Sequence, residues 1–168
     1  KEIRFPHSLG LLYSAFTFYL GFRVNSGEYK LMGLAPYGEA KYADLIKKEL
    51  IHFNKDGSFS INQKYFSYAD DLKMINKNFI DLFGKEPRKP DSKEYDKFYL
   101  DIAASIQSVT EEVILNITKS IKKEFNINNI CLSGGVALNC VANGKLLKKK
   151  IFKNIWIQPS SGDAGCAI

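Results

Sequence analysis

The sequence predicts an α/β fold, and three patterns support this. Residues 8–22 are nearly all apolar, lack proline and are too many for one strand, so they are expected to form a buried helix. Residues 93–125 carry apolar side chains at every third or fourth position, which predicts one long amphipathic helix. The later residues alternate between strand and helix patterns, which predicts a parallel βαβ unit at about 127–158.

The first helix is expected to begin after Pro6 and His7. The next segment, 23–38, is expected to be a shaped loop in place of a regular element, because glycine and proline crowd into it. Loops of this kind often carry binding residues. Apolar positions at helical spacing then predict a short amphipathic helix within 39–51.

A small hairpin is expected around the turn signal at 55–58, because Phe59, Ile61 and Tyr65 follow it in a strand-like alternation. Residues 70–83 are expected to form a helix that ends at Gly84.

A surface linker is expected next, since Pro87 and Pro90 punctuate the chain there. Asp91 and Glu94 stand at the spacing of a capping box and are expected to begin the long helix. A chain of 168 residues is expected to form one domain around a single core.

The composition, with 45% apolar and 25% charged residues, is that of an ordinary soluble protein. No apolar run reaches the ~20 residues that span a bilayer, and no signal peptide is apparent, so a cytoplasmic protein away from membranes is expected. The basic residues behind the net charge of +6 are spread along the sequence and do not form a recognised RNA-binding pattern, so nucleic acid is not an expected partner.

The three cysteines, Cys131, Cys140 and Cys166, lack the spacing of a metal site and favour a reduced compartment. Cys131 is expected to lie in the core.

The first candidate site is the turn between the predicted strand and helix of the βαβ unit. Two consecutive glycines, Gly134 and Gly135, let a ligand approach the backbone, and the helix start offers N–H groups to a phosphate. Ser133, Val136 and Asn139 complete the predicted phosphate site. The alternative is that the glycines only permit a sharp turn, and the glycines alone do not decide between the two.

The second candidate site lies in the small-residue loop that follows the last strand. Asp163 is its carboxylate, and ligands of open α/β sheets gather at the carboxyl ends of strands, so Asp163 is a candidate to hold a divalent metal or position a phosphate. The alternative is an N-cap of a following helix.

A third candidate is Lys30, within the glycine-rich segment 27–38, whose charge suits a phosphate. A solvated surface lysine is the alternative. The two histidines, His7 and His52, are too far apart for a metal-binding motif made from this segment alone.

Four stretches together resemble the O-carbamoyltransferases that tailor nodulation factors, cephamycin and tobramycin. These stretches are FPHSLGLLYSAFTFYLGF at 5–22, GEYKLMGLAPYG at 27–38, LSGGVALNCVANGKL at 132–146 and IWIQPSSGDAG at 155–165. They occur in the order found in that family, while residues 50–125 match it mainly in length and helicity.

The resemblance implies part of an N-terminal domain with the actin and Hsp70 type of ATPase fold, which is ribonuclease H-like and has a mixed sheet with packed helices. It implies that ATP and carbamoyl phosphate form a carbamoyl-adenylate, whose carbamoyl group passes to a small-molecule hydroxyl acceptor. A YrdC-like C-terminal domain of the same chain is expected. In this reading, Ser133–Val136 would face the nucleotide phosphates.

The family also implies a divalent metal, iron-like or Mg²⁺, held by an H-x-x-x-H pair and an aspartate. Asp163 matches that aspartate, and the histidine pair is expected upstream of Lys1. The segment alone is therefore expected to be an inactive fragment of a longer enzyme. Two alternatives stay open: another enzyme of the same ATPase superfamily, which transfers threonylcarbamoyl to tRNA or phosphorylates a small molecule, and a non-catalytic nucleotide-binding or scaffold module.

Overall fold

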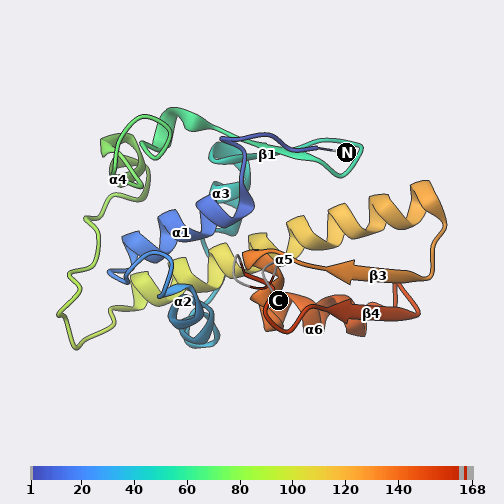
Figure 1. Ribbon diagram of the computed structural model, residues 1–168. Coiled ribbons are helices and arrows are strands. Elements are labelled where there is room, and N and C mark those ends of the chain that lie inside the picture. Colours follow the sequence, from blue (N-terminus) through green and yellow to red (C-terminus); the bar gives the residue numbers. More distant parts are fainter. Residues whose placement is uncertain (1, 163–164, 166–168) are drawn as a thin grey trace. The chain divides into compact units, whose positions relative to one another are not determined.

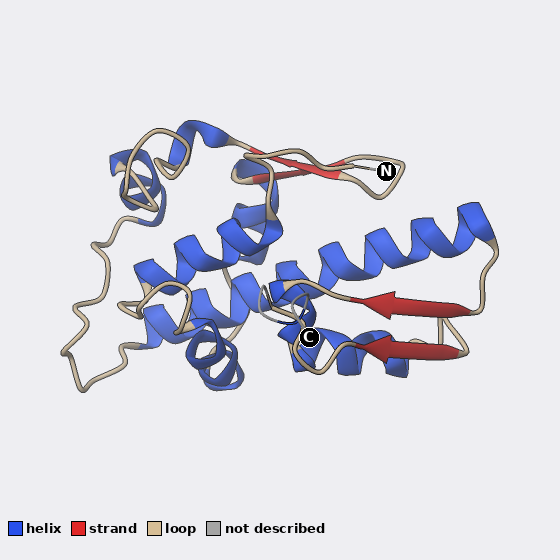
Figure 2. Cartoon of the chain, in the orientation of Figure 1, coloured by secondary structure: helices blue, strands red, loops and turns tan. Residues whose placement is uncertain are grey.

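The computed structural model describes residues 2–162 and 165, and it is a mixed α/β structure of helices and small sheets (Figures 1 and 2). This confirms the predicted α/β class. The chain divides into two compact units. Unit 1 is Lys1–Phe53 with Phe59–Val109, and unit 2 is Asn54–Ser58 with Thr110–Ile168.

The first helix of unit 1, α1 (Leu9–Tyr19), confirms the prediction from the apolar run. Ser8 is its N-cap, and the Ser8 hydroxyl accepts a hydrogen bond from the Leu11 N–H at 3.2 Å. Nδ1 of His7 accepts the N–H of Ile61 at 3.1 Å, so this histidine has a structural partner.

The predicted loop 23–38 is wrong, because most of it is helical. It contains α2 (Glu28–Leu34) and the 3₁₀ turn η1 (Ala35–Tyr37). The side chain of Leu31 is fully buried, and this burial stabilises the helix despite the glycine within it. The glycine and proline signals marked the ends of this helix more than its interior.

The next elements are α3 (Ala43–Glu49) and a hairpin of β1 (Ile51–Phe53) and β2 (Phe59–Ile61). The strands pair antiparallel, with His52 opposite Ser60, which confirms the predicted hairpin. Tyr65 does not extend the second strand, since it ends the 3₁₀ turn η2 (Gln63–Tyr65).

Helix α4 (Lys77–Phe83) is shorter than the predicted 70–83. Asn76 starts it, because its side-chain oxygen accepts the N–H of Phe79 at 3.3 Å. The helix ends at Gly84 as predicted, and this glycine has the left-handed conformation, with φ +68.

The segment expected to be a surface linker contains a buried arginine. Arg88 is 5% exposed, and its guanidinium lies 4.1 Å from the ring centre of Tyr95. Its backbone N–H donates to the Tyr19 carbonyl at 2.9 Å, and Nη1 donates to the Leu20 carbonyl at 3.4 Å. These contacts fix the segment to the end of α1.

The long helix α5 (Lys97–Phe125) begins later than the predicted capping box. Asp96 lies at its start, where Oδ1 accepts the N–H of Phe98 at 2.9 Å. The cap predicted from Asp91 and Glu94 is therefore wrong, because a nearer carboxylate meets the first N–H groups. The first part of α5 belongs to unit 1 and the second part to unit 2.

Unit 1 has an aromatic core. Phe16 and Tyr19 of α1 each contact Phe79 of α4 edge to face, with ring centres 5.2 Å apart. Edge-to-face pairs add about 0.5–1.5 kcal/mol each beyond the burial of their area. The hydroxyl of Tyr19 donates to the Lys85 carbonyl at 2.5 Å, and burial raises the pKa of this phenol.

Unit 2 contains the parallel pair β3 (Asn129–Leu132) and β4 (Asn154–Ile157), joined through α6 (Cys140–Lys148) (Figure 1). This is the strand, helix and parallel strand that the sequence pattern predicts. A hydrophobic cluster in this unit joins α5, the first strand and the region of α6; its buried residues are Leu115, Ile130, Leu146 and Phe152.

Cys131 is exposed, so its prediction as a core residue is wrong. Side chains alternate along a strand, and Ile130 takes the inward position beside it. Among the described residues, no helix combines the length and apolar character needed to cross a membrane.

Candidate functional site

The strand β3 leads directly into the predicted glycine turn. Gly134 has φ +95 and ψ 164, a conformation that is essentially restricted to glycine. A Cβ atom added at Gly134 or Gly135 would meet no atom of the described residues within 4 Å. The backbone of this turn is therefore open to close approach by a ligand.

The N–H groups that follow Gly134 are available at this turn. In the described part of the chain, the N–H groups of Gly135 and Val136 donate no backbone hydrogen bond. They begin the 3₁₀ turn η3 (Gly135–Leu138), and first-turn N–H groups have no partner within their own helix. Such groups are typical partners of phosphate oxygens.

The loop after β4 contacts this turn. The N–H of Gly134 donates to the Ser161 carbonyl at 2.8 Å, and the N–H of Gln158 donates to the Leu132 carbonyl at 3.3 Å. Because β3 and β4 are parallel, both loops leave the carboxyl end of the sheet, which is where ligands of α/β sheets gather. The two predicted loops are thus joined within unit 2.

Asn139 has a structural role in this turn. The 3₁₀ turn η3 follows the glycines, and α6 begins only at Cys140. The Asn139 side-chain oxygen caps it by accepting the Ala142 N–H at 3.0 Å. Binding of a nucleotide by Asn139, Ser133 or Val136 stays a prediction.

The structure does not test the two other predicted site residues. Lys30 is an exposed residue of α2 in unit 1, whereas the turn belongs to unit 2. Asp163 lies outside the described residues. Among the residues that are described, no group of three or more His, Cys, Asp or Glu side chains is placed to hold a metal. The metal site therefore stays a prediction.

Glu28, which follows Gly27 in the predicted binding segment, ties α2 to α1. Its Oε1 accepts the Ser14 hydroxyl at 2.8 Å and the Asn25 N–H at 3.0 Å, and its Oε2 accepts the Gly27 N–H at 3.1 Å. Sequence reasoning missed this anchor, because Ser14 is far from Glu28 in the chain.

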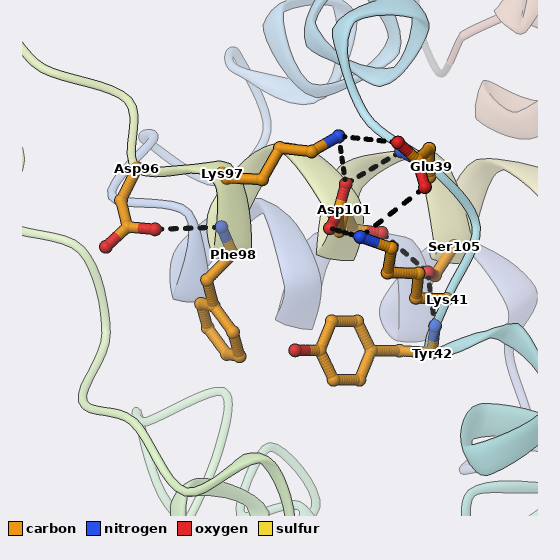
Figure 3. A network of polar contacts seen from close by, with 8 residues as sticks. All are labelled: Glu39, Lys41, Tyr42, Asp96, Lys97, Phe98, Asp101 and Ser105. Atoms are coloured by element: carbon orange, nitrogen blue, oxygen red, sulfur yellow. Dashed lines mark hydrogen bonds and ion pairs between the residues drawn. The ribbon is translucent and has the colours of Figure 1, made fainter.

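A second anchor that sequence reasoning missed is a buried carboxylate network after the same segment (Figure 3). Asp101 of α5, with a side chain only 4% exposed, accepts the Glu39 N–H at 2.8 Å. Its oxygens also lie 3.3 Å from Lys41 Nζ and 3.1 Å from Lys97 Nζ. Next to it, the Ser105 hydroxyl accepts the Tyr42 N–H at 2.9 Å.

This network lowers the pKa of the Asp101 carboxyl group. Burial acts to raise the pKa of Asp101, but the hydrogen bond from the Glu39 N–H and the contacts with Lys97 and Lys41 outweigh it, so the pKa is lowered. The charged carboxylate therefore holds the segment after Gly38 against α5. A signal was present in the sequence, since Asp101 and Ser105 interrupt the apolar stripe of that helix.

The fold and the site define an α/β protein with a strand, glycine turn and helix suited to an anionic ligand. The chain belongs to the carbamoyltransferase family, since residues 1–168 match the family described as Carbamoyltransferase N-terminus. This confirms the resemblance seen in the four motifs.

Three relatives match nearly the whole chain. An uncharacterised protein of Synechocystis sp. is 62% identical over 99% of the chain. Nodulation protein NolNO of Sinorhizobium fredii is 36% identical over 98%, and nodulation protein NolO of Bradyrhizobium diazoefficiens is 32% identical over 99%. The chain covers 27%, 22% and 28% of these relatives, respectively, so it spans about a quarter of their length.

Proposed function

We propose that this chain is the nucleotide-binding part of an ATP-dependent O-carbamoyltransferase. The intact protein moves a carbamoyl group from carbamoyl phosphate, through a carbamoyl-adenylate, to the hydroxyl group of a small molecule. Family membership supports the carbamoyl transfer, and the turn after β3 supports the nucleotide. The proposal includes the actin and Hsp70 type of ATPase fold, a cytoplasmic location and a YrdC-like domain elsewhere in the same chain.

The contact between Gly134 and Ser161 carries this proposal. It occupies one N–H of the turn, while the next two, those of Gly135 and Val136, have no backbone partner among the described residues. An anion held by these two groups would be positioned by backbone that is already in place, so little reorganisation is needed on binding. Ser133, an exposed hydroxyl residue, directly precedes the turn.

When bound, ATP supplies the adenylate that activates the carbamoyl group. The role of this chain is then to bind and orient the phosphates, with Ser133 and the N–H groups of Gly135 and Val136 as partners. Lys30 is proposed as a further cation for a phosphate. Asp163 is proposed as a ligand of a divalent metal, iron-like or Mg²⁺, because carboxylate oxygens bind either metal.

Incubation of the full-length protein with ATP, carbamoyl phosphate and a panel of hydroxyl compounds tests the proposal. We expect AMP and a carbamate product, both dependent on carbamoyl phosphate. ATP binding without any AMP would favour a non-catalytic nucleotide-binding module. AMP formation that needs threonine and bicarbonate in place of carbamoyl phosphate would favour the threonylcarbamoyl-transferring enzymes of the superfamily.

A further inference from the structure

Gln158, directly after β4, makes three hydrogen bonds, two of them within its own loop and one to β3. Its backbone N–H donates to the Leu132 carbonyl, its backbone carbonyl accepts the Ser161 hydroxyl, and its side-chain Nε2 donates to the Gly165 carbonyl at 2.9 Å. Leu132 is the last residue of β3. The side chain of Gln158 thus closes the loop, while its backbone holds the loop to the neighbouring strand.

Gly165, at the other end of this loop, is also closely packed. The Gly165 N–H donates to the Gly162 carbonyl at 3.0 Å. A Cβ atom at Gly165 would overlap the Ser160 carbonyl and lie 2.9 Å from Nε2 of Gln158, so only glycine fits. Ser161 is 2% exposed, and its carbonyl accepts the Gly134 N–H. The backbone carbonyl of Gln158 therefore holds the residue that contacts the glycine turn.

The side-chain amide of Gln158 carries an unfavourable feature. Among the described residues, Oε1 of Gln158 is buried and has no hydrogen-bond partner. A buried acceptor without a partner is destabilising, so glutamine is a poor choice here for stability alone. A group of this kind calls for a specific explanation, and the bond that the described residues give this side chain is the one from Nε2 to Gly165.

We propose that Gln158 is a positioning residue that sets the Ser161 carbonyl, and through it the N–H groups that follow Gly134, for binding a nucleotide phosphate. This rests on the proposed function. Loss of the bond between Nε2 and Gly165 would release the loop, shift the Gly134 contact and misdirect the N–H groups of Gly135 and Val136. Gln158 acts through other residues and is not itself a ligand contact.

Substitution Gln158→Met in the full-length protein tests this inference, with ATP as the probe. Methionine is similar in length but has neither the donor nor the orphan acceptor. We expect ATP affinity, measured by isothermal titration calorimetry, to fall on the order of tenfold, as small displacements of positioned groups do. The melting temperature should stay equal or rise. A merely structural glutamine would instead lose stability and affinity together.

Asn154→Met is the matched control, because it makes a comparable polar-to-apolar change at the other end of β4, where Asn154 donates to Asn129 at 2.7 Å. It should leave ATP affinity unchanged. If Gln158→Met does not fold, Gln158→Asn keeps the amide but is too short to reach Gly165, and the same loss of affinity is expected. Wild-type affinity in a folded Gln158 variant overturns the inference. A wild-type protein that binds no ATP refutes the proposed function itself.

Discussion

The N–H of Gly134 donates to the carbonyl oxygen of Ser161 at 2.8 Å, and this bond joins the two loops that leave parallel strands. Gly134 has φ +95, a backbone conformation that residues other than glycine rarely adopt. In the described part of the chain, the N–H groups of the next two residues donate no backbone hydrogen bond. One glycine thus connects the fold of unit 2 with its proposed chemistry.

Gly134→Ala should destabilise the protein, because alanine is strained at this backbone conformation by about 1–3 kcal/mol. Urea unfolding measures the loss. Gly144→Ala is the control, since this glycine lies within α6 with open space around it and alanine favours a helix. Equal stability of Gly134→Ala and the wild type would show that the turn is not fixed as described.

Gly135→Val should weaken ATP binding more than folding. A side chain there meets no protein atom within 4 Å, so the fold tolerates it, but the side chain would occupy the space through which a phosphate approaches. Titration calorimetry on the full-length protein checks the affinity, and thermal unfolding checks the fold. An unchanged ATP affinity would contradict the proposed site.

Asn139→Asp separates capping from binding. Aspartate caps helices as well as asparagine and its charge suits a helix N-terminus, so stability should be kept. A carboxylate near a bound phosphate should repel it and lower ATP affinity by roughly tenfold through like-charge repulsion. Retained affinity with retained stability would restrict Asn139 to its role as the cap of α6.

Asp101→Asn should destabilise the protein at neutral pH, with an effect that disappears in acid. The folded-state pKa of Asp101 lies below its ordinary value of 3.8, so the carboxylate stabilises the fold above that value. This stability is lost as the pH falls through the lower folded pKa.

Thermal unfolding of both proteins between neutral pH and about pH 2 measures this dependence. Asp44→Asn is the control, because Asp44 is 98% exposed and pairs with Lys47 on the surface, where an ion pair contributes little. A stability gap between Asp101→Asn and wild type that is the same at every pH would contradict the assignment.

Asp163→Ala in the full-length protein should abolish metal-dependent carbamoyl transfer with little loss of stability. If Asp163 is only a helix cap, the change should cost about 1 kcal/mol and leave transfer intact. Metal content measured by mass spectrometry, together with product formation, distinguishes the two.

Local patterns predicted the parts of the fold that depend on neighbouring residues. The apolar run of α1, the hairpin and the strand, turn and helix around Gly134 all follow from short-range spacing. The candidate phosphate turn was found for the same reason, because consecutive glycines after a strand are visible in the sequence.

The misses depend on partners far away in the chain. Helix α2 forms where a loop was expected, and Glu28 holds its start to Ser14. The expected linker contains Arg88, which bonds to the end of α1. Asp101 meets Glu39 across 62 positions. Sequence spacing does not identify the two partners of such contacts, which meet only once the chain has folded.

Hydrogen–deuterium exchange of the full-length protein with and without ATP tests whether the turn after β3 binds the nucleotide phosphates. We expect ATP to slow exchange in the peptide covering residues 133–139, since its N–H groups would bond to phosphate oxygens. Protection that appears elsewhere in the protein while this peptide exchanges at its ligand-free rate would contradict it.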